Sequence, residues 1–127
     1  MPDKILLVED NPQNMKVMVM ALRPHGYTLS QAVDGEEGYT AAVKERPDLI
    51  IMDMRLPKMD GMEVIRKLRG MPEFNNVPII AVTAYAMKGD REHFLEAGCD
   101  YYLSKPIDTR QLPRVVAEIL LNRKQES

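Results

Sequence analysis

Five polar side chains each follow a short apolar stretch of the chain, and they comprise three carboxylates, one hydroxyl and one amine: Glu9, Asp10, Asp53, Thr83 and Lys105. If those stretches are strands of one sheet, the five side chains converge on a single edge. Three carboxylates that face one crevice repel one another, so that one of them takes up a proton or the group holds a cation. A loose set of oxygen ligands suits Mg²⁺, which keeps several waters and binds one or two carboxylates together with phosphate oxygens.

Each carboxylate taken alone has a simpler explanation, because acidic residues often cap the helix that follows a strand. That explanation covers Asp10 or Asp53 singly, but it does not account for three acids together. Beside a cation, Asp53 can act as a nucleophile and form an acyl phosphate. Thr83 would then supply a hydroxyl donor and Lys105 a positive charge, and a cis bond between Lys105 and Pro106 would aim the ammonium inward.

The apolar stretches that position these residues have the character of buried strands. Residues 5–8, 49–52 and 77–82 are apolar without alternation and short, which is typical of parallel strands covered on both faces. Weaker strands are predicted at residues 27–33 and 99–104.

Segments with the helical period separate and follow these strands. Their apolar residues recur three or four places apart, most clearly in the last segment: Met15, Met18, Leu22; Tyr39, Ala42, Val43; Met62, Ile65, Leu68; and Leu112, Val115, Val116, Ile119, Leu120. Capping residues predict where the helices begin: Asn11-Pro12, Asp34-Gly35, Asp60-Gly61 and Asp108. Two glycines predict where helices end: Gly26 and Gly98.

Five strands and five helices in strict alternation predict a doubly wound α/β domain of the flavodoxin-like class. Right-handed crossovers with helices on both faces favour the strand order 2-1-3-4-5. Ligands of such sheets bind outside the carboxyl ends of the strands where the order reverses, here between the first and third strands. We expect one domain over residues 1–127, with its core at about residues 3–122.

Composition narrows the classes of function. The 17 Lys and Arg against 19 Asp and Glu leave a net charge of -2, which gives no basis for nucleic-acid binding, since that affinity comes from clustered positive charge. The first apolar run is too short for a signal peptide, and none approaches the roughly 20 residues that span a bilayer. A soluble, cytoplasmic protein without a membrane partner is expected. Cys99, the only cysteine, is predicted to be a core side chain rather than a catalytic thiol.

Four fragments of the chain carry a resemblance to a known family: residues 9–11 (Glu-Asp-Asn), 52–61 (Met-Asp-Met-Arg-Leu-Pro-Lys-Met-Asp-Gly), 82–84 (Val-Thr-Ala) and 104–106 (Ser-Lys-Pro). In this order and at these spacings they resemble the receiver domain of two-component response regulators. The resemblance implies that Asp53 accepts a phosphoryl group from a histidine kinase or a histidine phosphotransfer protein. It also implies that Lys105 binds that group, and that Mg²⁺ is held by Glu9, Asp10, Asp53 and the backbone carbonyl of Arg55.

The resemblance further implies a switch made of Thr83 and an aromatic residue three places before the lysine. Adjacent residues of a strand point to opposite faces, so only one of Tyr101 and Tyr102 can serve, and the spacing selects Tyr102. The alternative is two tyrosines with packed rings and wet hydroxyls. Arg55 and Tyr85 occupy positions that tune loss of the phosphoryl group in this family, and their bulk predicts a long-lived phosphorylated state. Exposed loop residues without such a role are the alternative.

Partners are also implied by the resemblance. The kinase would dock on the first helix around Gln13, Asn14 and Val17, and a downstream protein would bind the face made by the fourth helix, fifth strand and fifth helix. No room is expected for an output domain, and residues 83–90 are similar to single-domain regulators of the DivK type.

Two other classes of function stay open. The first class is a phosphohydrolase with an aspartate nucleophile on a similar sheet. Such enzymes have the pattern Asp-x-Asp, in which the second carboxylate serves as general acid, but Arg55 occupies that second place here. The other class is a receiver-like interaction module that never takes phosphate, against which the acidic cluster argues. We expect a phosphoacceptor switch that catalyses only its own phosphorylation and dephosphorylation, rather than an enzyme.

Overall fold

The computed structural model describes residues 3–84 and 95–126, with side chains as far as residue 123. Its five parallel strands form one sheet in the order β2-β1-β3-β4-β5. The strands are β1 (Lys4–Val8), β2 (Thr28–Ala32), β3 (Leu49–Asp53), β4 (Ile79–Thr83) and β5 (Tyr101–Ser104). The doubly wound architecture and the strand order predicted from the sequence are therefore confirmed.

Burial along the strands explains why three of them stood out in the sequence. Every residue of β3 and β4 is buried, as are the last four residues of β1. The edge strands β2 and β5 are partly exposed and correspondingly more polar. The apolar runs thus mark the strands that are covered on both faces.

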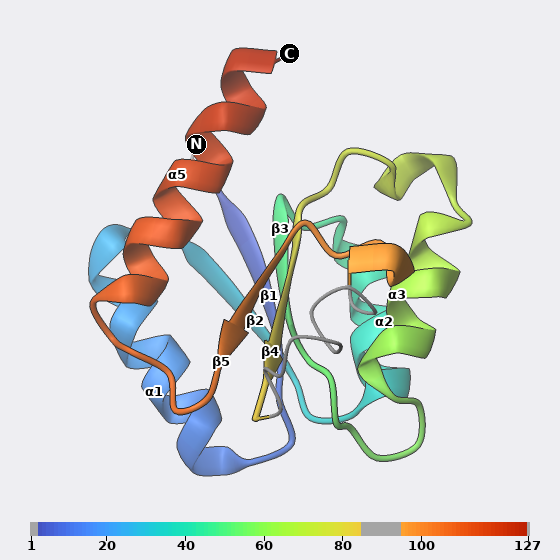
Figure 1. Ribbon diagram of the computed structural model, residues 1–127, viewed down its shortest axis with the longest axis horizontal. Helices are drawn as coiled ribbons and strands as arrows, with labels where there is room; N and C mark the ends of the chain where they lie inside the picture. The colour runs from blue at the N-terminus through green and yellow to red at the C-terminus, as the bar shows by residue number, and fades with distance from the viewer. Residues whose placement is uncertain (1–2, 85–94, 127) are drawn as a thin grey trace.

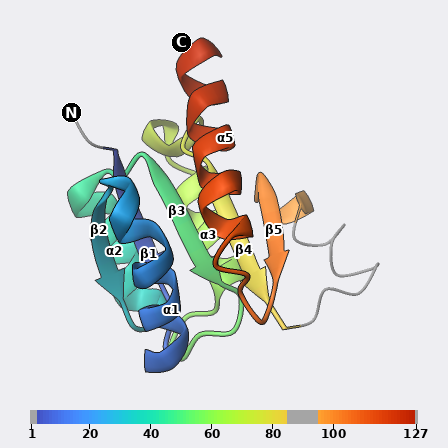
Figure 2. The same cartoon turned by 90° about the vertical axis from the view of Figure 1, so that its left-hand side faces the viewer.

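The helices cover the sheet from both sides. They are α1 (Pro12–Leu22), α2 (Gly35–Glu45), α3 (Gly61–Arg69) and α5 (Gln111–Glu126), with short 3-10 helices η1 (Arg23–His25) and η2 (Pro72–Phe74). Figure 1 shows α1 and α5 on one face and α2 and α3 on the other, and Figure 2 shows α1 and α5 side by side. The predicted fourth helix falls largely on residues 85–94, outside the described residues, although residues 95–97 are helical. None of the described helices is long and apolar enough to cross a membrane.

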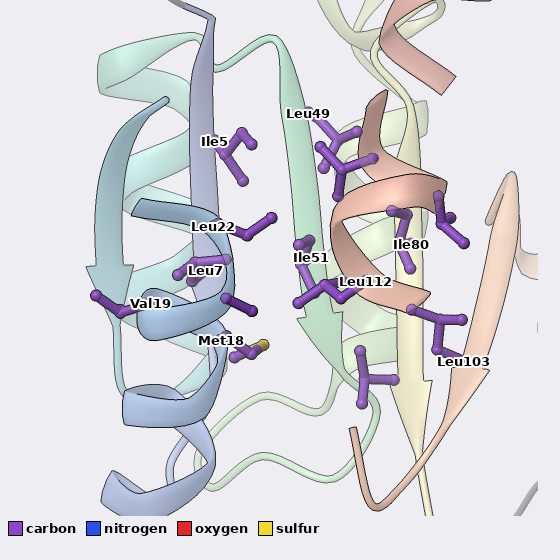
Figure 3. Close-up of a cluster of buried hydrophobic side chains, with 14 of the residues drawn as sticks. Ile5, Leu7, Met18, Val19, Leu22, Leu49, Ile51, Ile80, Leu103 and Leu112 are labelled. Atoms are coloured by element: carbon purple, nitrogen blue, oxygen red, sulfur yellow. The ribbon is translucent and has the colours of Figure 1, made fainter. Parts of the chain in front are cut away.

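The core has two halves, one on each side of the sheet. Figure 3 shows the half under α1 and α5, where Leu7 of β1 lies near Leu22 of α1 and Ile51 of β3 lies near Leu112 of α5. The other half lies under α2 and α3 and includes Cys99, which is buried as predicted. Burial raises the pKa of its thiol to about 11, so the thiol is protonated near neutral pH.

Several element boundaries differ from the predicted ones. The second strand ends at Ala32, which leaves Val33 exposed, and Val43 is also exposed although its spacing placed it on the apolar face of α2. The fourth and fifth strands begin two residues later than predicted. The last helix begins at Gln111, because Asp108 caps it from three residues upstream by accepting a hydrogen bond from the Gln111 N–H at 3.1 Å.

Candidate functional site

The topology brings the predicted polar residues to one edge of the sheet. Asp53 and Thr83 are the last residues of β3 and β4, Glu9 and Asp10 follow β1, and Lys105 follows β5. Because all the strands are parallel, their carboxyl ends meet at the same edge, where Figure 2 shows the arrowheads of β3, β4 and β5. The strand order reverses between β1 and β3, as the sequence predicted, and ligands of such sheets bind beside that point.

The three carboxylates form one cluster. One side-chain oxygen of each of Glu9, Asp10 and Asp53 lies within 4.8 Å of the others. Glu9 and Asp53 are only 1% and 4% exposed, whereas Asp10 is exposed to solvent. Two carboxylates of the cluster are therefore buried, and the cluster is open to solvent on the side of Asp10.

Lys105 reaches into this cluster from the end of β5. Its ammonium lies 2.9 Å from Asp53 Oδ2 and 3.1 Å from Glu9 Oε1. Burial opposes the charge of Lys105, but the hydrogen bond to Asp53 and the negative charges of Asp53 and Glu9 outweigh it and raise its pKa above the ordinary value. The peptide bond between Lys105 and Pro106 is cis. The lysine is therefore a charged counter-ion shared by two acids.

The main chain supplies further donors to the carboxylates. The Arg55 N–H donates to Asp53 Oδ1 at 3.0 Å, and the Asn11 N–H donates to Glu9 Oε2 at 3.2 Å. Asn11 also caps α1, as its position before Pro12 predicts, since its side chain accepts from the N–H groups of Gln13 and Asn14. Its backbone N–H can reach the Glu9 carboxylate because Asn11 follows Glu9 by two residues.

One oxygen of this cluster is incompletely satisfied. Glu9 Oε1 is buried and accepts no hydrogen bond from the described residues, since Lys105 approaches it at ion-pair distance without hydrogen-bond geometry. Burial, followed by the hydrogen bond and charge of Asp53, raises the pKa of Glu9 to about 7. A carboxylate held in this way is protonated or needs a further cation.

These features fit a divalent metal. The donors are carboxylate oxygens of three residues within 4.8 Å of one another, and Glu9 has an oxygen, Oε1, that accepts no hydrogen bond from the described residues. A hard cation such as Mg²⁺ takes oxygen ligands of this type and fills its other positions with water or phosphate oxygens. Glu9, Asp10 and Asp53 could hold it, and the exposed side at Asp10 leaves room for those remaining ligands.

The predicted switch residues lie on the two strands that follow β3 in the sheet. Thr83 is 2% exposed at the end of β4, one strand away from Asp53. Tyr102 is half-buried and packs against the core under α2 and α3, whereas Tyr101 is 42% exposed. The two tyrosines therefore differ in environment as the strand alternation predicts.

The remaining predicted positions are distributed around this edge. Arg55 is exposed in the loop between β3 and α3. Tyr85 lies outside the described residues. On α1, Gln13 is exposed, while Asn14 and Val17 are half-buried.

The sequence comparisons with known proteins agree on one family. The sequence profile of the response regulator receiver domain matches residues 5–117. The chain is 42% identical to the polar-differentiation response regulator DivK of Brucella anthropi over 119 residues, which are 94% of this chain and 94% of that protein. The DivK protein of Brucella ovis is 40% identical over the same shares of both chains.

Solved structures agree with this comparison. The receiver domain of a sensor histidine kinase from Pseudomonas aeruginosa, with a magnesium ion coordinated in its active-site cleft, is 42% identical to this chain. It superposes with a TM-score of 0.87 over 94% of this chain and 98% of that one. A CheY-like receiver domain protein from Methanospirillum hungatei is 28% identical, with a TM-score of 0.92 over the full length of both chains.

Proposed function

This chain belongs to the response regulator receiver domain family, and from that premise we propose that it is a single-domain switch whose phosphoryl acceptor is Asp53. The observation that carries the proposal is the contact of Lys105 with Asp53 at 2.9 Å inside a cluster of three carboxylates. This arrangement supports the proposal because a carboxylate that could act as nucleophile, oxygens that could bind a metal and a cation for the incoming charge lie together.

Receiver domains of this family serve as phosphoacceptor switches in two-component signalling, and the chemistry of the site supports that role here. An Asp53 carboxylate oxygen attacks the phosphorus of a phosphohistidine, the O–P bond forms as the N–P bond breaks, and the imidazole leaves with its electron pair. Mg²⁺, when bound, neutralises charge on the transferring group. Glu9, Asp10 and Asp53 would hold the metal, and we assign a fourth ligand to the Arg55 carbonyl.

Lys105 and Thr83 then respond to the new charge. A phosphoryl group adds up to about two negative charges, and Lys105 follows a phosphoryl oxygen as its pairing with Asp53 is replaced. The Thr83 hydroxyl donates a second hydrogen bond, and Tyr102, on the neighbouring strand, moves into the space that Thr83 leaves. The new charge on Asp53, at the end of β3, thereby changes the positions of the Thr83 side chain on β4 and the Tyr102 side chain on β5.

The partners follow from where these changes reach the surface. We propose that a histidine kinase or phosphotransfer protein docks on α1, whose residues Gln13, Asn14 and Val17 lie beside the acceptor edge. A downstream protein binds the face that includes β5 and α5, where Tyr101 and Leu121 are 42% and 57% exposed. The chain and its DivK relative from Brucella anthropi each align over 94% of their length, which supports a single-domain regulator. We propose that it acts in the cytoplasm.

One experiment separates this switch from its rivals. The protein is incubated with Mg²⁺ and acetyl phosphate and its intact mass is measured, with Asp53→Asn as the matched variant. A gain of one phosphoryl group in the wild type and none in the variant supports the proposal. Repeated turnover of a phosphoester would favour a hydrolase, for which Arg55 stands in place of the general acid, and absence of any gain with all donors, a histidine kinase included, would favour an interaction module.

A further inference from the structure

The loop between β3 and α3 rests on the first turn of α2. The Gly35 N–H, at the start of α2, donates to the Pro57 carbonyl oxygen at 3.3 Å. Next to it, Lys58 Nζ lies 3.7 Å from Asp34 Oδ2, and Lys58 has a positive φ of 67°. The tip of this loop, residues 57–59, is therefore held by an element outside the site.

Gly35 permits this contact because it has no side chain. A Cβ atom at position 35 would lie 1.5 Å from the Met59 carbonyl oxygen and 2.5 Å from the Met59 carbonyl carbon, far inside the 3.0 Å that real Cβ contacts respect. The obstacle is main chain rather than the flexible end of a side chain, so any larger residue has to push the loop tip away by an ångström or more. The requirement for glycine here is steric, since Gly35 does not have a positive φ.

The same loop carries atoms of the site. It leaves Asp53 with the Arg55 N–H bonded to Asp53 Oδ1 at 3.0 Å. It returns through Gly61, whose N–H donates to the Met54 carbonyl oxygen at 3.4 Å. Between these fixed points the loop contains only residues 55–60, so a displacement of its tip is transmitted to the main chain at Arg55.

We propose that Gly35 is a positioning residue for the metal site, because its bare backbone lets α2 hold the loop that presents the Arg55 carbonyl. This inference rests on the proposed function, in which that carbonyl is a ligand of Mg²⁺ beside Asp53. Gly35 touches neither the metal nor the phosphoryl group. It acts through the Pro57–Met59 tip.

The chemistry of Mg²⁺ makes the consequence specific. Mg²⁺ demands nearly ideal octahedral geometry at about 2.0 to 2.1 Å, whereas Ca²⁺ accepts six to eight oxygens at about 2.3 to 2.6 Å in adaptable arrangements. A carbonyl moved by an ångström is lost to Mg²⁺ but can be replaced around Ca²⁺. Residues that orient metal ligands typically contribute about 10-fold to 100-fold in affinity, so Gly35→Ala should weaken Mg²⁺ binding by about 10-fold or more and Ca²⁺ binding far less.

The experiment compares Gly35→Ala with Gly38→Ala, a matched change one turn later in α2. A Cβ at position 38 would lie 2.8 Å from Val8 Cγ1, a core side chain, and not against the loop. Dissociation constants for Mg²⁺ and for Ca²⁺ are measured by calorimetry on the wild type and both variants, with thermal unfolding in parallel. Tryptophan fluorescence is not an option, since the chain has no tryptophan.

A Mg²⁺-to-Ca²⁺ affinity ratio that falls in Gly35→Ala and stays at the wild-type value in Gly38→Ala supports the inference, whatever the loss of thermal stability. Equal ratios in all three proteins would overturn it. A wild type that binds no Mg²⁺ and gains no phosphoryl group would instead count against the proposed function itself.

A second measurement on the wild type covers the case in which Gly35→Ala does not fold. Coupling between sites is reciprocal, so if Gly35 positions the metal ligands, Mg²⁺ must in turn stabilise the Gly35 contact with Pro57. Hydrogen exchange of the Gly35 amide, followed by NMR, should slow severalfold on Mg²⁺ addition, while exchange of the Gly26 amide at the opposite edge of the sheet stays unchanged. Equal exchange of Gly35 with and without Mg²⁺ would contradict the inference.

Discussion

Lys105 Nζ lies 2.9 Å from Asp53 Oδ2, and the same ammonium is 3.1 Å from Glu9 Oε1. One lysine from the end of β5 is thus shared by two buried carboxylates that β1 and β3 bring together, and its single charge offsets only one of theirs. A cation in this position competes with a metal for the same oxygens, and after phosphoryl transfer it is already beside the new charge. We therefore expect the unmodified site to be preorganised for phosphorylation, with Lys105 already placed to contact the phosphoryl group.

Replacement of Lys105 by methionine should destabilise the metal-free protein, because Glu9 and Asp53 would then be left without their cation. We expect the free energy of unfolding at about pH 8 to fall by about 2 kcal/mol, and saturating Mg²⁺ to restore most of the loss. Urea denaturation with and without Mg²⁺ measures both effects. Lys16→Met, at an exposed lysine of α1, should change stability by less than about 0.5 kcal/mol. A loss in Lys105→Met that Mg²⁺ does not reduce would argue against a shared carboxylate site.

The raised pKa of Glu9 predicts how metal affinity depends on pH. With a pKa of about 7, Glu9 is mostly protonated at about pH 6 and must release its proton when Mg²⁺ binds. Mg²⁺ affinity should therefore rise severalfold between about pH 6 and pH 8, with proton release on binding that calorimetry in two buffers detects. Glu9→Gln should bind more weakly and with a flat pH profile over this range. A wild-type profile as flat as that of the variant would contradict the assignment of Glu9.

The same shift predicts the opposite trend for the stability of the metal-free protein. A group whose pKa is raised on folding contributes stability that is fully present below its unfolded value, here 4.5, and is lost as the pH rises through about 7. The contribution of Glu9 to the free energy of unfolding should thus decline across that window without Mg²⁺. Thermal unfolding of wild type and Glu9→Gln at several pH values, in the presence of a chelator, isolates it as the difference between the two proteins.

The sequence predicted the fold well because the central strands leave a strong signal. Residues 49–52 and the residues before Thr83 are buried on both faces of the sheet. A short, continuous apolar run of this kind is typical of a buried strand. The ends of the elements and the exposed positions near them were predicted less well. Val33 and Val43 are apolar yet exposed, and a pattern of residue types cannot tell an exposed valine from a buried one when the element has ended or turned.

The sequence predicted which residues form the candidate site but not which of their side chains contact one another. Acids after strands and a lysine before proline indicated which side chains converge, whereas the sharing of Lys105 between Asp53 and Glu9 depends on distances between three strands. The role of Gly35 could not be read from the sequence either. Its position after Asp34 indicated a helix start, and only the path of the loop 24 residues later shows that a Cβ would meet Met59.

Thr83→Ala should separate phosphorylation from switching. Asp53, the metal ligands and Lys105 remain, so the intact mass should still show the phosphoryl group after treatment with acetyl phosphate. Charge-assisted hydrogen bonds contribute about 1.5 to 3 kcal/mol each, and loss of one of two removes a large part of the roughly 5.5 kcal/mol that drives a switch nearly to completion. The NMR shift of the Tyr102 ring on phosphorylation should shrink in Thr83→Ala and return in Thr83→Ser. A full shift in Thr83→Ala would show that Tyr102 does not depend on Thr83.

Arg55 should lengthen the life of the phosphorylated state, because its large side chain follows Asp53 by two places on the exposed side of the site. We expect Arg55→Ala to shorten the half-life severalfold, as water gains access to the acyl phosphate. The decay of the phosphorylated mass after removal of the donor measures this directly. Arg66→Ala, at an exposed arginine of α3, serves as the control. A wild-type half-life of minutes that neither Arg55→Ala nor Tyr85→Ala changes would contradict the prediction for both positions.

Arg69 should contribute to stability rather than to the chemistry, because it joins α3 to the opposite, amino-terminal edge of the sheet. Its guanidinium donates to the carbonyl oxygens of Gly98, Phe74 and Val77, and it pairs with Asp100 at 2.7 Å. Arg69→Met leaves these acceptors without their donor and should lower the free energy of unfolding by about 2 to 4 kcal/mol.

Arg69→Lys should recover only part of that loss, because an ammonium cannot reproduce the planar fork of donors that meets several carbonyls at once. Urea denaturation measures both variants, and phosphorylation by acetyl phosphate at a temperature where each is folded should match the wild type. A variant that is as stable as the wild type would show that these hydrogen bonds are replaced by water. A variant that folds but is phosphorylated slowly would show instead that the two edges of the sheet are coupled through α3.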